Sequence, residues 1–158
     1  KHEKSRACAW AREKFVILQV RNSPYILYMT QETTQTGYRQ QQYSGPVKRY
    51  CQTLDLRDNP ELIAEYRRRH SAAHVWPEIL AGIREVGILE MEIYILGIRL
   101  AMIVETPADF DWETAMARLA TLPRQAEWED YMAEFQLVRA GMSSAEKWQP
   151  MERMFHLY

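Results

Sequence analysis

A tyrosine and a histidine four residues apart are the first candidates for chemistry in this chain of 158 residues. If the segment is helical, Tyr66 and His70 lie on the same face. Histidine has an ordinary pKa of about 6.5 and exchanges protons near neutrality, so the pair suits acid–base catalysis beside a hydroxyl donor. A purely structural interpretation is that a histidine at a helix end interacts with the helix dipole, next to a tyrosine at the core edge. Spacing alone favours this second interpretation.

A metal site is a weaker hypothesis. His74 follows His70 at the i, i+4 spacing of a helical metal pair, but no H-E-x-x-H motif is present and Pro77 predicts that a new helix starts nearby. The two cysteines, Cys8 and Cys51, lack the paired spacing of a zinc site. We therefore expect no metal ion. The sequence also contains no glycine-rich phosphate-binding motif and no G-x-S-x-G motif.

Aromatic residues suggest a ligand type. Trp76, Trp128 and Trp148 accompany the histidine and several carboxylates in the second part of the chain. Flat aromatic faces can stack on the C–H surfaces of sugars, so such a group suits a carbohydrate pocket. For any one tryptophan, filling the core is the better interpretation.

Composition excludes several classes of protein. Apolar residues make up 47% and charged residues 26%, with a net charge of −1, which fits one globular domain and gives no sign of general binding to nucleic acid or anionic membranes. No apolar stretch reaches the roughly 18 residues of a membrane span. The run FVILQV is too short for the core of a signal peptide. With two cysteines and no disulfide framework, we expect a reducing, cytoplasmic location.

The composition changes near Pro46. Residues 1–46 hold seven Lys/Arg against three Asp/Glu, whereas the remainder holds thirteen against eighteen. We expect 1–46 to be an N-terminal extension that is disordered or not native, with short strands possible at 14–20 and 25–30 but no convincing pairing. A basic interaction arm is the alternative. The chain begins with lysine rather than methionine, so we treat it as a possible fragment, and we expect the functional domain at 47–158.

Residues 47–158 predict an alternation of strands and helices. Asn59 and Pro60 signal one helix start, Pro77 another, and a turn is expected near Gly97 between two strands. The predicted elements are a strand at 48–56, helices at 59–70 and 76–87, strands on both sides of Gly97 between 89 and 105, one or two helices at 111–136 broken at Pro123, and a strand within 145–158. This β-α-(α)-β-β-α-β order is that of an α+β, ferredoxin-like fold, with helices on one face of a four-stranded antiparallel sheet.

The second face of that sheet needs a cover. Successive residues of a strand point to opposite faces of the sheet, and large side chains occur at both kinds of position, for instance Ile93 and Tyr94, or Met102 and Ile103. A second subunit that packs sheet against sheet would bury this face, so we expect a homodimer. A ligand groove on a monomer is the alternative.

Four separated blocks resemble the L-rhamnose mutarotase family, and their order and spacing make the resemblance specific over about residues 48–158. They are EYRRRH…VWPEI, GILEMEIYILGIRLAMIVE, EWEDYMAEFQ and AEKWQPMERMFHL. The resemblance implies a dimeric α+β barrel built from ferredoxin-like subunits. It also implies interconversion of the α and β anomers of a monosaccharide, a 6-deoxy hexose, without redox change or cofactor.

The resemblance also implies roles for individual residues. The family's proton-donating histidine falls on His70 and its sugar-binding tyrosine on Tyr66, which favours the catalytic interpretation of this pair. A substrate-binding tyrosine of the family falls on Met91, and its paired tryptophans fall on Trp128 and Glu129. Methionine cannot hydrogen-bond a sugar hydroxyl, whereas a carboxylate can accept one or carry a second proton. Trp128 would stack on the sugar.

The departures from the family bear on the substrate. Five residues separate His70 from Trp76, against three in the rhamnose enzymes, and this pattern resembles members assigned to L-fucose. We expect L-rhamnose, with L-fucose a close second. A non-catalytic sugar-binding or regulatory protein and a small oxygenase or haem-handling protein are the alternatives on a similar fold. Retention of both Tyr66 and His70 favours the enzyme.

Overall fold

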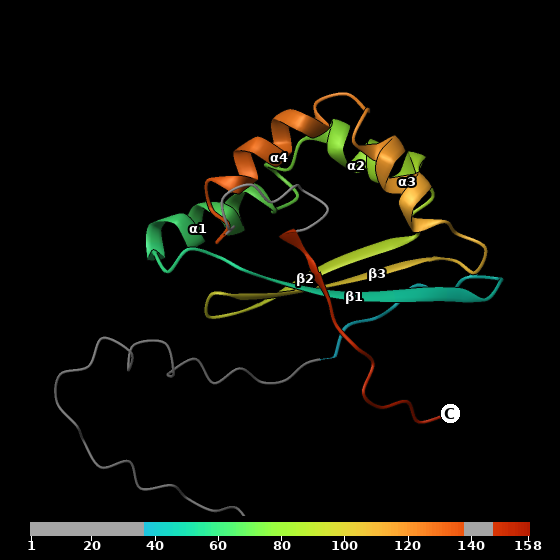
Figure 1. Ribbon diagram of the computed structural model, residues 1–158. Coiled ribbons are helices and arrows are strands. Elements are labelled where there is room, and N and C mark those ends of the chain that lie inside the picture. The colour runs from blue at the N-terminus through green and yellow to red at the C-terminus, as the bar shows by residue number, and fades with distance from the viewer. Residues whose placement is uncertain (1–36, 138–146) are drawn as a thin grey trace, which may run out of the picture. The chain divides into compact units, whose positions relative to one another are not determined.

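The computed structural model describes residues 37–137 and 147–158, so the short strands considered at 14–20 and 25–30 lie outside the described residues. The chain divides into two units at residue 40, and the following description concerns the second unit, residues 41–158. Its described part runs in the order β1-α1-α2-β2-β3-α3-α4-β4 (Figure 1).

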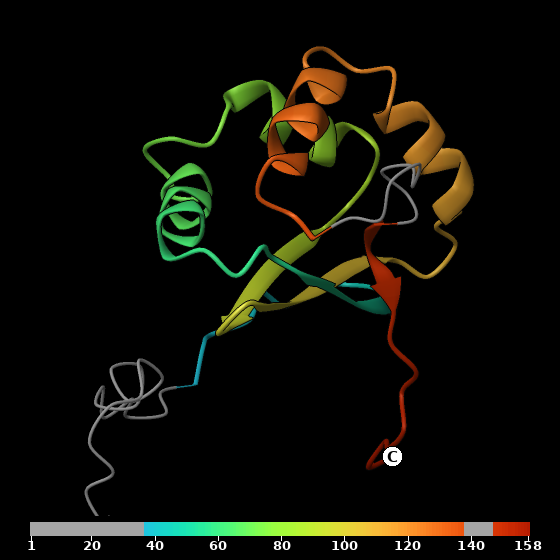
Figure 2. The ribbon, with the colours of Figure 1, turned by 60° about the vertical axis from the view of Figure 1, so that its left-hand side comes forward.

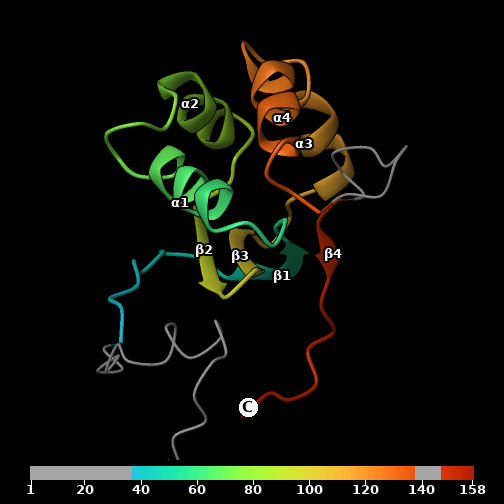
Figure 3. The same ribbon diagram turned by 90° about the vertical axis from the view of Figure 1, so that its left-hand side faces the viewer.

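A four-stranded antiparallel sheet forms one layer, in the order β2-β3-β1-β4 (Figure 3). The strands are β1 (Val47–Asp55), β2 (Glu90–Leu96), β3 (Arg99–Pro107) and β4 (Gln149–Pro150). Strands β2 and β3 form a hairpin whose turn contains Gly97 at a φ of 60°. The α+β class and the antiparallel sheet predicted from the sequence are confirmed.

Helices form the second layer and lie on one face of the sheet (Figure 2). They are α1 (Pro60–Arg69), α2 (Pro77–Glu85), α3 (Trp112–Leu119) and α4 (Gln125–Ala133). The predicted break at Pro123 separates α3 from α4, and Arg124 before α4 adopts a left-handed φ of 62°. Within the described ranges, none of the helices is long and apolar enough to cross a membrane.

Local signals set the helix ends. The Asn59 side chain accepts hydrogen bonds from the backbone amides of Glu61 and Leu62, which satisfies two donors at the start of α1. Pro60 and Pro77 occupy the first turns of α1 and α2, where a missing N–H costs nothing. Gly87, with a φ of 91°, follows α2 in a conformation that suits glycine.

The core lies between the sheet and the helices. Leu54 on β1 and Leu100, Met102 and Val104 on β3 are buried on the helix side. Ala101 and Ile103, which alternate with these residues on β3, are only partly buried and point to the other face. No helix among the described residues covers that face (Figure 2).

The C-terminal strand lies within the predicted segment and is very short. Only Gln149 and Pro150 form β4, which pairs with Gln52 and Thr53 of β1. Proline has no backbone N–H to donate, so it limits the ladder at this edge. The chain makes one more bond, from the Met151 amide to the Cys51 carbonyl (2.8 Å), and residues 151–158 then continue without regular structure, all of them exposed. They run away from the helices (Figures 1 and 3).

Candidate active site

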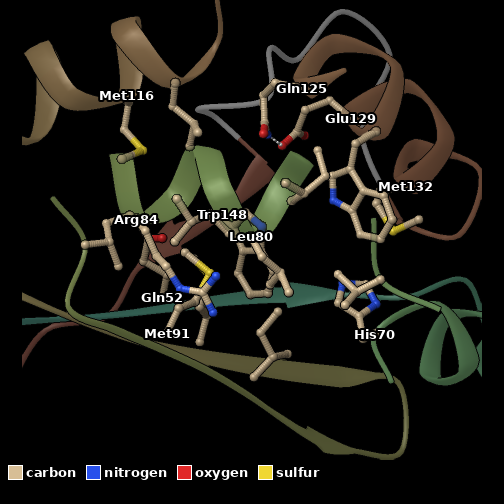
Figure 4. Close-up of a pocket in the computed structure, with 18 of the residues that line it drawn as sticks. Gln52, His70, Leu80, Arg84, Met91, Met116, Gln125, Glu129, Met132 and Trp148 are labelled. Carbon is tan, nitrogen blue, oxygen red and sulfur yellow. Dashed lines mark hydrogen bonds between the residues drawn. The ribbon is translucent and has the colours of Figure 1, made fainter. Parts of the chain in front are cut away.

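A cavity of about 960 Å³ lies between the sheet and the helices. This volume is at the upper end of the range of about 300–1,000 Å³ for small-molecule sites. The five residues singled out from the sequence all line it: Tyr66, His70, Met91, Trp128 and Glu129. Figure 4 shows several of the lining side chains, with His70 on one side and Met91 towards the other. The fold therefore brings together residues from α1, β2 and α4.

Helix α1 supplies Tyr66 and His70, and its last turn fixes the histidine ring. His70 Nδ1 lies 2.9 Å from the carbonyl oxygen of Tyr66. A carbonyl can only accept, so Nδ1 carries the proton and Nε2 is the nitrogen left for a ligand. The two rings are also in contact, with centroids 4.1 Å apart.

Burial favours the neutral form of His70. It lowers the pKa of the imidazole below its ordinary value of 6.5, and the hydrogen bond to the Tyr66 carbonyl opposes this shift only in part. At neutral pH the ring is therefore mainly uncharged, with a lone pair on Nε2. In this state His70 must accept a proton before it can donate one.

Tyr66 keeps its proton. Burial raises the pKa of its hydroxyl well above 10, a hydrogen bond from Gln136 acts in the opposite direction, and the charge of Glu129 raises it further. The side chain is only 3% exposed, and its ring packs edge-on against Phe135 with centroids 6.0 Å apart. The hydroxyl is thus a hydrogen-bond donor at any pH at which the protein would work.

Helix α4 contributes an aromatic wall. The Trp128 ring is buried and meets His70 edge-on, with centroids 5.5 Å apart, and Trp76 at 5.2 Å. Trp76 itself lies outside the cavity lining and carries the Arg124 guanidinium 3.8 Å above its ring centroid. Of the three tryptophans named from the sequence, Trp128 and Trp148 line the cavity.

A hydrogen bond links the two helices that carry the site. Glu65 on α1 accepts hydrogen bonds from Arg68 and Arg69 of the same helix and from the Tyr131 hydroxyl of α4, the last at 3.3 Å. The hydrogen bonds from the two arginines lower the pKa of the Glu65 carboxyl to about 2, and Arg68 has the larger effect. This contact holds the Tyr66–His70 turn against α4.

Glu129 lies at the cavity beside two hydrogen-bond donors. Gln125 Nε2 donates to its Oε1 at 3.1 Å, and Lys147 Nζ lies 3.5 Å from its Oε2. The same ammonium donates to the Glu129 carbonyl at 3.3 Å, and only 7% of the Lys147 side chain is exposed. Both neighbours offer protons to Glu129, so its oxygens act as acceptors.

Met91 belongs to the apolar part of the cavity. It extends from β2 and packs against a cluster that contains Ile88, Met102 and Val104, with Met116 nearby in the lining. In Figure 4 it lies away from His70 and Glu129. His70 and Glu129 thus lie at one end of the cavity, which we call its polar end, and Met91 lies towards the other, where Gln52 and Arg84 also line the cavity.

Three residues of the polar end were missed from the sequence. Gln125 shares a helix face with Glu129 at i, i+4, so its spacing could have revealed it. Gln136 and Lys147 also lie beside Tyr66 and Glu129, but only the folded chain brings them there. No local spacing signals either contact.

The second histidine of the sequence lies apart from the site. His74 is exposed, and its Nδ1 lies 2.9 Å from the Ser71 hydroxyl. In the part of the chain that the structure describes, no group of three or more His, Cys, Asp or Glu side chains is arranged to hold a metal ion.

Comparisons with known proteins agree on one family. The model of the L-rhamnose mutarotase family matches residues 49–157. An L-fucose mutarotase of Xanthomonas campestris pv. campestris is 40% identical over 111 residues, which cover 70% of this chain and 89% of that protein. An L-rhamnose mutarotase of Sinorhizobium fredii is 31% identical over 108 residues, covering 65% of this chain and 92% of the relative.

A solved structure supports the fold. The crystal structure of an L-rhamnose mutarotase from Formosa agariphila superposes with a TM-score of 0.53 at 22% identity, covering 70% of this chain and 99% of that chain. With the family match over residues 49–157, these findings show that the chain belongs to the L-rhamnose mutarotase family.

Proposed function

We propose that this protein interconverts the α and β anomers of a 6-deoxy hexose, with His70 as the proton carrier. The observation that carries the proposal is the commitment of His70 Nδ1 to the Tyr66 carbonyl, at 2.9 Å, in a ring that also lines the cavity. This arrangement leaves a single nitrogen, Nε2, to exchange protons with a sugar.

The proposed reaction needs one proton carrier and no cofactor. Neutral His70 accepts the proton of the anomeric hydroxyl O1–H through Nε2, while the C1–O5 bond breaks and C1 becomes an aldehyde. The imidazolium then gives this proton to O5. Because O1 and O5 are both bonded to C1, one nitrogen can serve both. Rotation about C1–C2 and the reverse steps close the ring on its other face. Acid–base catalysis of this kind typically contributes about 10²–10⁴-fold.

The other residues of the site would hold the sugar. Tyr66 donates a hydrogen bond, Trp128 offers an aromatic face, and Met91 lies against apolar parts of the substrate. For Glu129 the contacts with Gln125 and Lys147 support the role of hydroxyl acceptor over that of second proton carrier. These assignments are part of the proposal.

The comparisons support a choice between the two sugars. The chain is 40% identical to an L-fucose mutarotase and 31% identical to an L-rhamnose mutarotase. We therefore propose L-fucose as the better substrate and L-rhamnose as the second, which reverses the order expected from the family alone. Family membership favours a catalyst over the non-catalytic and haem-handling alternatives. The cytoplasmic location stays a prediction.

Anomer exchange measured by NMR tests the function directly. Saturation-transfer rates would be recorded for L-fucose, L-rhamnose and D-glucose with and without protein. We expect faster exchange for the two 6-deoxy sugars, and loss of most of the acceleration in His70→Ala. Exchange that is no faster with protein than without it contradicts the function. Full activity in His70→Ala contradicts the role of this residue alone, and sugar binding without acceleration supports the non-catalytic alternative.

We also propose that the subunit is ferredoxin-like and that two subunits form an α+β barrel, sheet against sheet. The support is the β2-β3-β1-β4 order and the half-buried Ile103 on a sheet face that no helix of the described residues covers. Sedimentation analysis should show a dimer for the wild type and a monomer for Ile103→Glu. Ala117→Glu, on the exposed side of α3, is the control and should remain a dimer. A monomeric wild-type protein contradicts the proposal.

A further inference from the structure

Gln136 is a buried polar side chain that the proposed mechanism does not use. It follows α4, lines the cavity and is only 3% exposed. Its side chain hydrogen-bonds the Tyr66 hydroxyl, which lies at the polar end of the cavity with His70. Gln136 is therefore within reach of whatever binds Tyr66.

The amide oxygen of Gln136 has no partner. Within residues 37–137 and 147–158, Oε1 of Gln136 is the one buried side-chain nitrogen or oxygen without a hydrogen bond. A buried acceptor left unpaired costs free energy, and buried polar atoms nearly always have partners. An unpaired acceptor on the wall of a cavity indicates that a ligand supplies the missing donor.

The backbone fixes the position of this side chain. Gln136 forms an isolated β-bridge with Leu56, which follows β1. On either side of it, the Leu137 amide donates to the Asp55 carbonyl at 2.8 Å and the Arg57 amide donates to the Phe135 carbonyl at 2.9 Å. The segment after α4 is thereby tied to the sheet. The terminal torsion of glutamine is broad, so the amide can still turn towards the cavity without moving the backbone.

The unpaired oxygen determines the direction of the hydrogen bond between Gln136 and Tyr66. Because Oε1 of Gln136 has no partner, the contact is made by the amide nitrogen, which can only donate, and the phenolic oxygen accepts. The phenolic proton and Oε1 of Gln136 are then left for a ligand. Together they offer one donor and one acceptor, and a sugar hydroxyl can use both because it accepts and donates at once.

We propose that Gln136 is a specificity-determining residue, whose Oε1 accepts a hydrogen bond from the same sugar hydroxyl that Tyr66 donates to. This inference rests on the proposed function of the cavity as a sugar site. A site that pairs a hydroxyl in this way rejects an analogue that lacks it, because its own polar groups are then left unpaired. The protein should thus discriminate strongly at one ring position of the sugar and weakly at the others.

The experiment uses L-fucose and its 2-, 3- and 4-deoxy analogues, with anomer exchange measured by NMR on the full chain. For the wild type we expect kcat/KM to fall by about tenfold or more for one analogue. In Gln136→Met, which keeps the length of the side chain but cannot hydrogen-bond, L-fucose itself should lose a similar factor. The selected deoxy analogue should then lose less than about twofold further, because the paired acceptor is already gone.

Gln149→Met provides a matched control, since it makes the same change at an exposed residue of β4 outside the cavity lining. It should leave the whole deoxy series unchanged. If Gln136→Met retains the wild-type pattern of discrimination, the proposal is wrong. It is also wrong if the wild type discriminates against none of the analogues, a result that does not depend on the folding of any variant.

The possible outcomes distinguish failure of this inference from failure of the proposed mutarotase function. If the wild type accelerates exchange but kcat/KM is the same for L-fucose and all three deoxy analogues, Gln136 has no role in specificity. The proposed mutarotase function is then unaffected. If the wild type does not accelerate exchange, dissociation constants are measured for the same sugars. Weaker binding of one deoxy analogue, with a difference that disappears in Gln136→Met, would support a specificity role for Gln136 in a binding protein. Absence of any sugar binding overturns both.

Discussion

The Nδ1 nitrogen of His70 lies 2.9 Å from the carbonyl oxygen of Tyr66, one turn earlier on α1, and the backbone amide of His70 approaches the same oxygen at 3.2 Å. This end of the helix carries partial negative charge, which favours a proton on Nδ1. The structural and catalytic interpretations of the Tyr66–His70 spacing are therefore compatible. The helix end holds the ring, and holding it in this tautomer prepares Nε2 for proton exchange.

The pH dependence of the rate should reflect the ionisation of His70. Burial lowers its pKa below 6.5, and the proposed mechanism needs the neutral ring. We expect kcat/KM to be level at neutral and mildly basic pH, and to fall through a single ionisation below about pH 6.5 as the ring becomes protonated. Exchange NMR from about pH 5 to 8, with the uncatalysed rate subtracted at each pH, gives this profile. A rate that rises on acidification contradicts the proposed base.

The same shift affects stability in one direction. The native state binds a proton on His70 less tightly than the unfolded chain, so this group destabilises the fold as the pH falls through the ordinary pKa of about 6.5 towards the lowered one. Activity at low pH should accordingly be normalised to the folded fraction, measured by circular dichroism.

Removing the Tyr66 hydroxyl should weaken the site without disturbing the core. Tyr66→Phe keeps the ring contacts with His70 and Phe135 but loses both the donor to the sugar and the acceptor for Gln136. We expect kcat/KM to fall by about 5- to 100-fold, as for the loss of one buried hydrogen bond of about 1–3 kcal/mol. Tyr43→Phe is the matched control, because Tyr43 lies outside the cavity lining and its hydroxyl donates to the backbone carbonyl of Leu89. Equal effects of the two substitutions would show that the Tyr66 hydroxyl has no special role.

Much of the fold could be predicted because its signals are local. Asn59, Pro60 and Pro77 act within a turn of their own position, and the spacing of Tyr66 and His70 is likewise contained in one helix. The length of the C-terminal strand could not be predicted, because it depends on pairing with β1. That pairing involves only Gln149 and Pro150, and it is not visible in the alternation of the segment itself.

The site could be predicted only in part, for the same reason. The positions of Trp128, Glu129 and Met91 came from the family resemblance, since nothing in their own segments distinguishes a cavity wall from a core. Gln136 and Lys147 contribute through contacts with residues distant in sequence, and through burial that only the folded chain creates.

The ion pair between Lys147 and Glu129 should act on substrate binding. Lys147→Met removes the buried ammonium that lies 3.5 Å from Oε2 of Glu129, so the carboxylate loses the cation that orients it. We expect KM to rise by about 5- to 50-fold, with kcat changed by less than about threefold, because the pair is assigned to substrate binding and takes no part in the proposed proton transfer. Initial rates of anomer exchange over a range of sugar concentrations would separate the two constants.

A double-mutant cycle provides the control for this ion pair. In a Glu129→Gln background, Lys147→Met should have little further effect, because the residue through which it acts has already lost its charge. Additive effects of the two substitutions would contradict the coupling. Arg118→Met, which breaks an exposed ion pair with Glu85, should leave KM unchanged.

The N-terminal cap of α1 should contribute measurably to stability. Asn59→Ala removes the acceptor for the backbone amides of Glu61 and Leu62, at 2.9 and 3.2 Å, and leaves both donors to water. We expect the free energy of unfolding to fall by about 0.5–2 kcal/mol in urea denaturation. The neighbouring, exposed Asp58→Ala should change it by less than about 0.5 kcal/mol. An equal effect at both positions would show that the cap is not the cause.

Met91 should influence which 6-deoxy sugar is preferred. The resemblance places a substrate-binding tyrosine of the rhamnose enzymes at this position, and Met91 is only partly buried on the wall of a cavity of about 960 Å³, which leaves room for a larger ring. Met91→Tyr should raise the ratio of kcat/KM for L-rhamnose over L-fucose by about tenfold, the size of one added hydrogen bond. Met91→Phe adds the ring without the hydroxyl and separates shape from hydrogen bonding. If both variants shift the ratio equally, the change in preference comes from the ring and not from the tyrosine hydroxyl. If neither shifts it, Met91 does not contact the part of the substrate in which the two sugars differ.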